Sequence, residues 1–147
     1  MPTLFDPSAR AQIISRVSRL TPDRQPLWGR MNAGQVQTHL ADQLRSGLGD
    51  LACRSKGGPF RYFPLRELII YLLPWPKGVP TAPELLSTTP AEFAGDQKAL
   101  TQLIERFGAR KPGEPWGEHP AFGRISRRAW GVLAWRHLDH HLRQFGL

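Results

Sequence analysis

Three of the five histidines in this chain of 147 residues stand close together near its end, in the stretch WRHLDHHLRQFGL. Two of them, His137 and His141, are four residues apart. If the stretch is helical, side chains at this spacing lie one turn apart on the same face. Both imidazoles can then reach one metal ion without distortion of the backbone. The spacing therefore indicates coordination of a divalent metal.

The apolar residues of the same stretch show which face these histidines occupy. At about 100° per residue, one arc of the helix contains the apolar residues Trp130, Ala134, Leu138 and Phe145. His137 and His141 fall within or beside that arc, whereas His140 falls toward its polar margin. Imidazoles buried side by side need either hydrogen-bond partners or a metal. This helix alone leaves open whether the pair is a metal site or a hydrogen-bonded core or interface pair.

A third histidine is expected on an earlier helix. The buried stripe of that helix consists of Val36, Leu40, Leu44 and Gly47. His39 lies at the edge of this stripe, where a single histidine is more often structural. Three histidines from two helices would nevertheless form an N3 site with open positions for water or substrate, as in catalytic metal sites. Zinc, nickel and iron all suit imidazole, so the metal is not identified.

Two segments of the chain resemble a known superfamily. They are RLTPDRQPLWGRMNAGQVQTHLADQLR and EHPAFGRISRRAWGVLAWRHLDHHLRQFGL. Both are similar to the DinB-like superfamily of four-helix metalloproteins, in particular to a bacterial branch of unassigned function, and the similarity is weak between residues 50 and 110. The resemblance implies that one early histidine and a late His-x-x-x-His pair bind the metal, here His39, His137 and His141. It also implies a relationship to transferases that conjugate bacillithiol, mycothiol or another small thiol to an electrophile.

The function expected from this resemblance is a metal-dependent transfer of a small thiol to an electrophile. A divalent ion lowers the pKa of a bound thiol and holds the thiolate as nucleophile at neutral pH. Gln43 and Gln144 lie on the histidine sides of their helices, so they are candidates to orient ligands or substrate. Asp42 and His140 are further candidates for a proton-transfer or ligand role.

Two other functions remain as alternatives. The first is a non-catalytic binding or stress-response protein whose histidines are structural. The second is a nucleic-acid-binding module, because the formal net charge is +8. Against the second, the basic residues are spread from Arg10 to Arg143 without a dense run, and no finger spacing, RNA-binding signature or basic recognition helix is present. A dispersed arginine excess is more typical of a solvated surface or of a field that attracts small anions.

Capping signals predict where the first two long helices begin. Asp6 and Pro7 are a typical helix start, and the helix that follows should end before residue 22. Asn32 begins the second helix, because Gln35 three residues later completes a capping box. This helix runs to about Gly49.

Two more long helices are expected in the second half of the chain. The capping box Thr89-Pro90-Ala91-Glu92 predicts a helix over residues 91–108. Ser126 caps the last helix, and Gly146 terminates it. No segment combines strand alternation with a hairpin signal. The predicted fold is therefore all-α, a four-helix bundle that forms one domain over residues 1–147.

A long irregular connection should join the second and third long helices. Between residues 57 and 90 it contains one short helix, Leu65 to Leu73, of two or three turns. Such a connection is either a functional cover or a packed surface loop, and the tryptophan of LLPWPKG indicates that part of it is pinned to the core. A second loop, WGEHPAFG, contains His119 and either covers the metal or plugs the end of the bundle. The plug is the preferred interpretation.

Composition predicts the surroundings in which the protein works. The start MPTLFDPSAR lacks the apolar stretch of a secretory signal, and the longest apolar run, Leu68 to Leu73, is too short to span a membrane. Cys53 is the single cysteine, so no internal disulfide can form. We therefore expect a cytoplasmic protein that binds a small-molecule substrate and no membrane. Helical proteins of this size often form homodimers, but no face of the helices is selected by the sequence.

Overall fold

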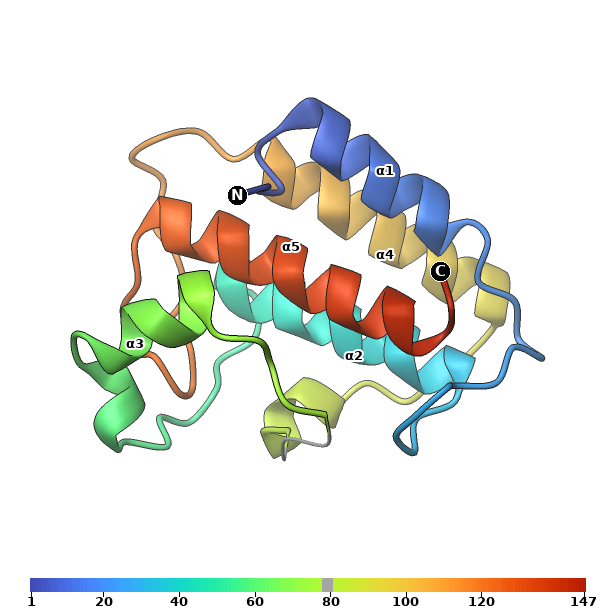
Figure 1. Cartoon of the computed structure of the whole chain (residues 1–147). Helices are drawn as coiled ribbons and strands as arrows, with labels where there is room; N and C mark the ends of the chain where they lie inside the picture. Colours follow the sequence, from blue (N-terminus) through green and yellow to red (C-terminus); the bar gives the residue numbers. More distant parts are fainter. Residues whose placement is uncertain (78–80) are drawn as a thin grey trace.

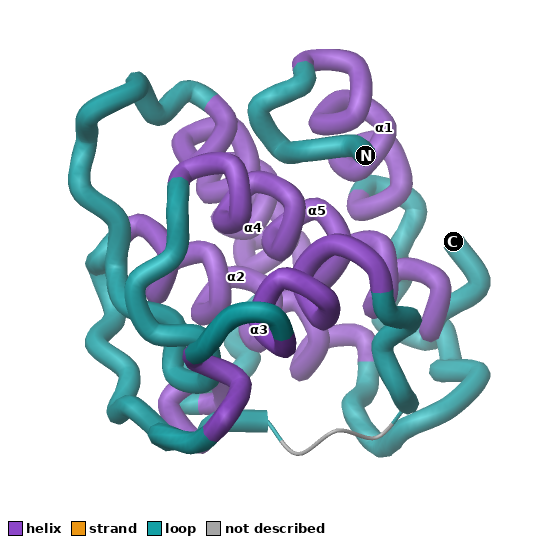
Figure 2. The backbone as a smooth tube through the Cα atoms, turned by 60° about the vertical axis from the view of Figure 1, so that its left-hand side comes forward, coloured by secondary structure: helices purple, strands orange, loops and turns teal. Residues whose placement is uncertain are grey.

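Helices form all the regular structure of the chain in the computed structural model, which describes residues 1–77 and 81–147 (Figure 1). The long helices are α1 (Pro7–Val17), α2 (Ala33–Leu48), α4 (Phe93–Gly108) and α5 (Arg127–Gln144). The short elements are η1 (Pro59–Arg61), α3 (Leu65–Glu67), the π-helical turn η2 (Leu68–Leu72) and η3 (Pro83–Leu86). Figure 2 shows helix and loop only, and no strand occurs in the described ranges. The predicted all-α class is confirmed.

Local capping fixes the start of the two helices that contain the histidines. At the start of α2 the side chain of Asn32 accepts from Gln35 N, and the Gln35 side chain accepts from Asn32 N, both at 2.9 Å. This is the predicted capping box, and it satisfies two backbone groups that a helix end leaves without intrahelical partners. At the start of α5 the Ser126 hydroxyl accepts from Ala129 N at 3.1 Å. Both predicted starts are confirmed.

The start of α4 differs from the prediction. The Glu92 carboxylate accepts from the backbone N–H groups of Ala94 and Gly95, so Glu92 is the N-cap and the helix begins at Phe93. The predicted capping box at Thr89 is wrong. The physical reason is competition between two acceptors. The carboxylate of Glu92 reaches two of the free N–H groups of the first turn and so takes the capping role expected of Thr89. The end of α4 at Gly108 agrees with the prediction.

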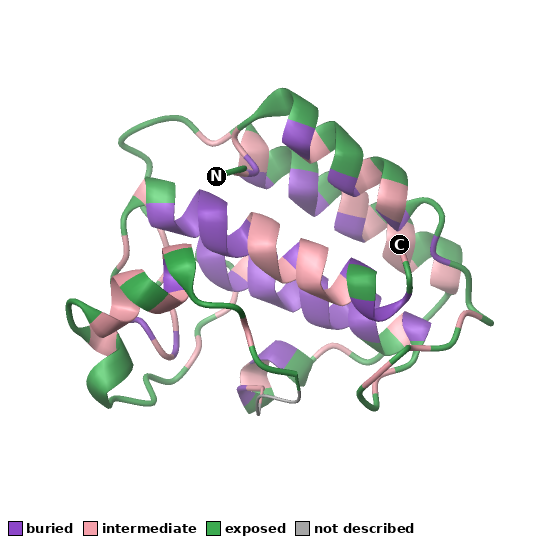
Figure 3. Cartoon of the chain, viewed as in Figure 1, coloured by how far each residue is buried: buried purple, intermediate pink, exposed green. Residues whose placement is uncertain are grey.

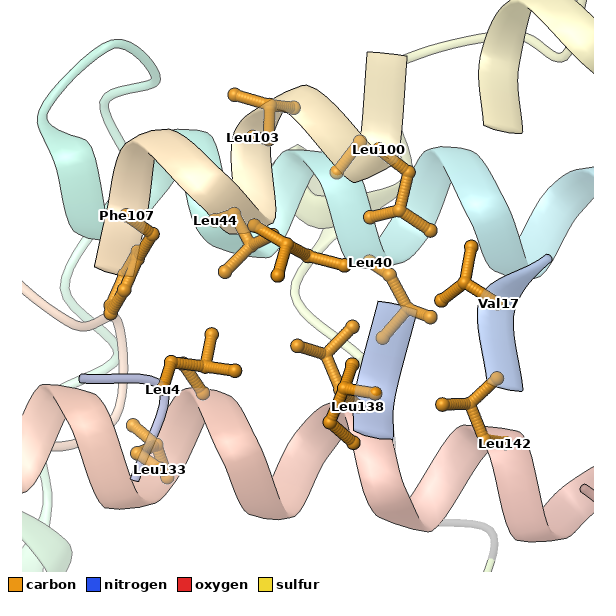
Figure 4. Packing of buried hydrophobic residues seen from close by; sticks show 14 of the residues in the cluster. Leu4, Val17, Leu40, Leu44, Leu100, Leu103, Phe107, Leu133, Leu138 and Leu142 are labelled. Atoms are coloured by element: carbon orange, nitrogen blue, oxygen red, sulfur yellow. The ribbon is translucent and has the colours of Figure 1, made fainter. Parts of the chain in front are cut away.

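The long helices turn their apolar faces toward one another. Helix α2 contacts α4 and α5, and α1 contacts the same two helices. Figure 3 shows the buried residues on the inward faces of α2 and α5, and Figure 4 shows apolar side chains from all four long helices meeting in the centre, with Val17 as the labelled residue of α1. The fully buried members include Leu40, Leu44, Leu100, Ile104, Phe107, Trp130 and Leu138. Each such side chain stabilises the fold by about 1.5–3 kcal/mol relative to an exposed one.

The connection between α2 and α4 packs along α5. Arg136 of α5 donates to the carbonyls of Ile69 and Ile70 at 2.9 and 2.7 Å. Its guanidinium lies 4.9 Å from the ring centroid of Trp75, whose indole N–H donates to Ile69 O at 3.0 Å. The prediction that the tryptophan packs this connection against the core is confirmed. The predicted short helix is present as the joined elements α3 and η2, whereas residues 78–80 of the connection lie outside the described residues.

None of the described helices has the length and apolar character needed to cross a membrane. The long connection places η3 against α2, where the carbonyl of Leu85 contacts His39. The fold therefore brings together parts of three distant segments around the histidines of α2 and α5.

Candidate metal centre

His39 of α2 meets His137 and His141 of α5. The ring centroid of His39 lies 4.8 Å from that of His137 and 4.9 Å from that of His141, and the two α5 rings are 4.8 Å apart. Each residue offers one nitrogen, and these three atoms lie within 4.8 Å of one another. The structure thus places the three predicted ligands close enough to hold a metal ion.

The backbone of η3 fixes the tautomer of His39. Its Nδ1 lies 2.9 Å from the carbonyl oxygen of Leu85. A carbonyl only accepts, so Nδ1 carries the proton and Nε2 presents a lone pair to the other histidines. An imidazole held in this way by a second group is the usual arrangement around protein metal sites.

A side-chain amide fixes the tautomer of His141. Gln144 Nε2 donates to the carbonyl of Trp28 at 2.6 Å, which turns its Oε1 toward His141 Nδ1, 2.7 Å away. Nδ1 of His141 therefore donates and Nε2 remains free. Gln144, a residue that the sequence marked as a candidate to orient a ligand, contacts a predicted ligand directly.

His137 completes the cluster from one turn earlier on α5. Its Nε2 lies 3.0 Å from Nε2 of His39, whose proton is on the opposite nitrogen. The lone pair on Nε2 of His39 can be satisfied in two ways, by a proton that His137 donates or by a cation between the rings. Nδ1 of His137 is buried and has no hydrogen-bond partner in the described part of the chain.

The spacing of the nitrogens can be compared with that of a metal site. Zinc–imidazole bonds of about 2.0–2.1 Å in a tetrahedral site separate neighbouring ligand nitrogens by roughly 3.3 Å. The 3.0 Å contact and the 4.8 Å limit bracket this separation. The spacing of the three nitrogens is therefore compatible with a single ion.

Burial keeps the cluster in the neutral form that binds metals. Loss of solvent lowers the pKa of His141 to about 3, and repulsion from His39 adds to the effect. Burial also lowers the pKa of His137 well below its usual value, and repulsion from His141 and His39 acts in the same direction. For His39 burial lowers the pKa, while the Leu85 carbonyl and Asp42 oppose the shift. Neutral imidazoles with free lone pairs are ligands at pH 7.

A cavity of about 730 Å³ opens onto the cluster. This volume is in the range of small-molecule sites. All three histidines line it together with Gln43 and Gln144, and its further walls include Trp28, Met31, Ile69, Trp75, Leu85, His119, Phe122, Leu133 and His140. A metal in the cluster would therefore face a space large enough for a substrate.

The remaining predicted residues lie in different places. Gln43 lines the cavity one turn from His39, and His140 lies beside it, 5.2 Å from the His141 ring. Asp42 is not one of the three residues of the cluster, and its carboxylate accepts from Thr88 N at 3.0 Å and from Arg45 at 2.9 Å. Its partners on the η3–α4 connection give Asp42 a structural role.

His119 combines parts of both interpretations offered for its loop. Its Nδ1 accepts from Ala121 N and Phe122 N at 3.2 Å each, and its ring packs on Phe122 and Trp130. This is the expected plug of the loop against the helices. The same ring lines the cavity, although it is not one of the three residues of the cluster.

Sequence reasoning did not identify several residues of the site. The carbonyl of Leu85 accepts from His39, and the carbonyl of Trp28 accepts from Gln144. Trp28 and Ile69 also line the cavity. Backbone acceptors have no sequence signal, because every residue has one. For Trp28 the one available sign was a tryptophan within the turn-rich segment before α2.

Comparison with known proteins gives one partial match. Residues 77–146 match the model of a family described as "Protein of unknown function (DUF1569)". The matched region contains α4 and α5, and therefore His137, His140 and His141, whereas His39 lies outside it. No curated protein and no solved structure matches the chain.

Proposed function

We propose that this protein is a metal-dependent enzyme of the DinB-like type, in which His39, His137 and His141 bind one divalent ion. Its proposed reaction joins the sulfur of a small thiol to an electrophilic carbon, whose leaving group departs with the bonding electrons while the thiol proton passes to water. The proposed fold is the corresponding four-helix bundle, in agreement with the contacts of α2 with α4 and α5 and of α1 with the same helices.

One observation supports the metal site above all others. Leu85 and Gln144 hold the Nδ1 protons of His39 and His141, so both residues direct Nε2 toward the same space. Such partners raise the basicity of an imidazole and fix its ring. A divalent ion bound there supplies Lewis-acid chemistry, which lowers the pKa of a thiol and keeps the thiolate as nucleophile.

Residues of the chain around the cluster would bind and orient the substrate. Gln43, His140 and the apolar walls line the space in front of the cluster. They can orient a substrate there and limit the access of water. Gln43 is 3% exposed, and its two amide atoms have no partner within residues 1–77 and 81–147, so its hydrogen bonds are available to a bound molecule.

Metal analysis tests the site. The full chain is equilibrated separately with Zn²⁺, Ni²⁺ and Fe²⁺, freed of excess metal by gel filtration and analysed by plasma mass spectrometry. We expect one ion per chain in the wild type and in His140→Ala, and a large loss in His39→Ala and His141→Ala. Negligible uptake of all three metals by the wild type would refute the site, and so would full uptake by both ligand variants.

Activity is tested on the metal-loaded chain. A panel of small thiols, including cysteine and glutathione, is mixed with monobromobimane, and the rate of thioether formation is followed by fluorescence. We expect a metal-dependent rate that disappears in His141→Ala. If the chain binds metal but accelerates none of the thiols, the transferase proposal fails and the metal site stands alone.

A further inference from the structure

Two tryptophans form aromatic walls of the cavity next to the histidine cluster. Trp28 lies 6.0 Å and Trp75 6.3 Å from the ring of His140, measured between centroids. Trp75 is also 6.1 Å from His137. These indoles come from loops far apart in the sequence, one before α2 and one after η2. Both rings line the same cavity, and they provide flat surfaces on which a planar apolar group can stack.

Both walls are held in place by other contacts. The indole N–H of Trp75 donates to Ile69 O, and the Arg136 guanidinium lies over its ring. The Trp28 carbonyl accepts from Gln144, and the Lys77 ammonium lies 4.3 Å from the Trp28 ring centroid. Rigid walls lose little conformational freedom when a ligand binds. The cavity is therefore preformed on its aromatic side.

The fully charged side chains in the described lining of the cavity have one sign. Its described lining contains two side chains with full charges, Arg30 and Lys56, and both are exposed, which places them at the opening. Asp139, adjacent to His140 in sequence, is engaged in ion pairs with Arg16 at 2.7 Å and Arg143 at 2.9 Å. Cations at the mouth of a cleft with apolar walls attract anions into it.

We propose that this cavity binds a small organic anion with a flat apolar body. The body lies against Trp28 and Trp75, the anionic group is attracted by Arg30 and Lys56, and Gln43 offers its free amide to a polar group of the ligand. The inference rests on the proposed function in treating the histidine cluster as the place of reaction. The stacking and the charge preference, however, belong to the chain itself and do not require the metal.

A matched set of probes tests the inference. Binding of 2-naphthoate, 2-naphthamide and 2-naphthylmethylammonium is measured by isothermal titration calorimetry at low ionic strength. Each is titrated into the EDTA-treated full chain and into the zinc-treated chain. We expect 2-naphthoate to bind the metal-free chain roughly fivefold more tightly than the amide, and the ammonium probe to bind most weakly. Added salt should reduce this preference.

Charge variants identify the residues responsible. The double variant Arg30→Gln/Lys56→Gln should bind the acid and the amide equally, whereas Arg19→Gln/Lys98→Gln removes the same charge from exposed positions outside the lining and should keep the preference. Trp75→Leu should weaken both probes. Equal binding of acid and amide to the metal-free wild type would overturn the inference, and so would a preference that survives the first double variant.

The outcomes separate this inference from the proposed function. A preference for 2-naphthoate seen only after zinc treatment would mean that the carboxylate binds the metal, which refutes the inference and leaves the metal site intact. A preference in the metal-free chain combined with no metal uptake would support the anion site and refute the metal-dependent enzyme.

Discussion

Gln144 decides which nitrogen of His141 faces the histidine cluster. Its Oε1 lies 2.7 Å from His141 Nδ1, and its Nε2 is held by the Trp28 carbonyl at 2.6 Å. The turn at residues 28–29 approaches so closely that a Cβ on Gly29 would lie 2.4 Å from Gln144 Nε2. Gly29 also has φ +81°, a conformation that favours glycine. A loop before α2 thus positions a side chain at the end of α5.

Substitution of Gln144 should weaken metal binding without removing a ligand. In Gln144→Leu the His141 ring loses its acceptor, and loss of such a partner lowers metal affinity by about 10–100-fold. Zinc affinity is measured by competition with a chromophoric chelator. Gln102→Leu, an exposed change on α4, is the control and should bind as the wild type does. An unchanged affinity in Gln144→Leu would show that the amide does not position His141.

Asp42→Asn should lower stability while metal uptake persists. The buried carboxylate joins α2 to the η3–α4 connection through Thr88, and it also pairs with Arg45 of α2. Loss of charge-assisted hydrogen bonds at a buried group costs about 1–3 kcal/mol, to be measured by urea denaturation. In the control, Asp50→Asn, the exposed pair with Arg106 is worth less than about 1 kcal/mol. Loss of metal from Asp42→Asn at unchanged stability would instead make Asp42 a ligand.

The metal-free chain should lose stability as the pH falls below about 6.5, the usual pKa of histidine. Burial, with a smaller contribution from Lys56, lowers the pKa of His119 in the folded chain to about 3. Between these values the unfolded chain binds a proton that the folded chain does not. The free energy of unfolding therefore falls with decreasing pH, by up to about 1.4 kcal/mol per unit for each such histidine.

His119→Gln measures this contribution, because His119 is outside the cluster of three. Urea denaturation of wild type and variant is compared between pH 7.5 and 4.5 in the presence of EDTA. In the acid range the free energy of unfolding of the variant should depend less steeply on pH, because unfolding takes up about one proton fewer. Above pH 7 the two slopes should be equal. Parallel curves throughout would contradict the burial of a neutral His119.

Gly117→Ala should destabilise the fold, because the loop with His119 lies directly on the end of α2. A Cβ at this position would be 2.0 Å from the carbonyl oxygen of Ser46, which is backbone and cannot move independently. Such overpacking costs about 1–3 kcal/mol or more. Gly34→Ala is the matched control, since its Cβ would meet Pro90 at an ordinary 3.5 Å. Thermal unfolding should show a lowered midpoint in the first variant alone.

The helices that contain the site could be predicted because their signals are local. Asn32 and Gln35 are three residues apart, as are Ser126 and Ala129, so each cap forms from neighbours in the sequence. The same holds for His137 and His141, whose shared face follows from helical periodicity. The prediction for the start of α4 failed because two competing acceptors, Thr89 and Glu92, stand near the same N–H groups.

The sequence by itself therefore determined the all-helical class, the long helices and the pairing of two histidines on α5. Only the tertiary structure decided that His39 meets them, that Leu85 and Gln144 fix their tautomers, and that Trp28 and Trp75 wall the cavity. The physical reason is distance along the chain. Periodicity and capping record neighbours within a few residues, whereas these contacts depend on how α2, α5 and the long connection pack together.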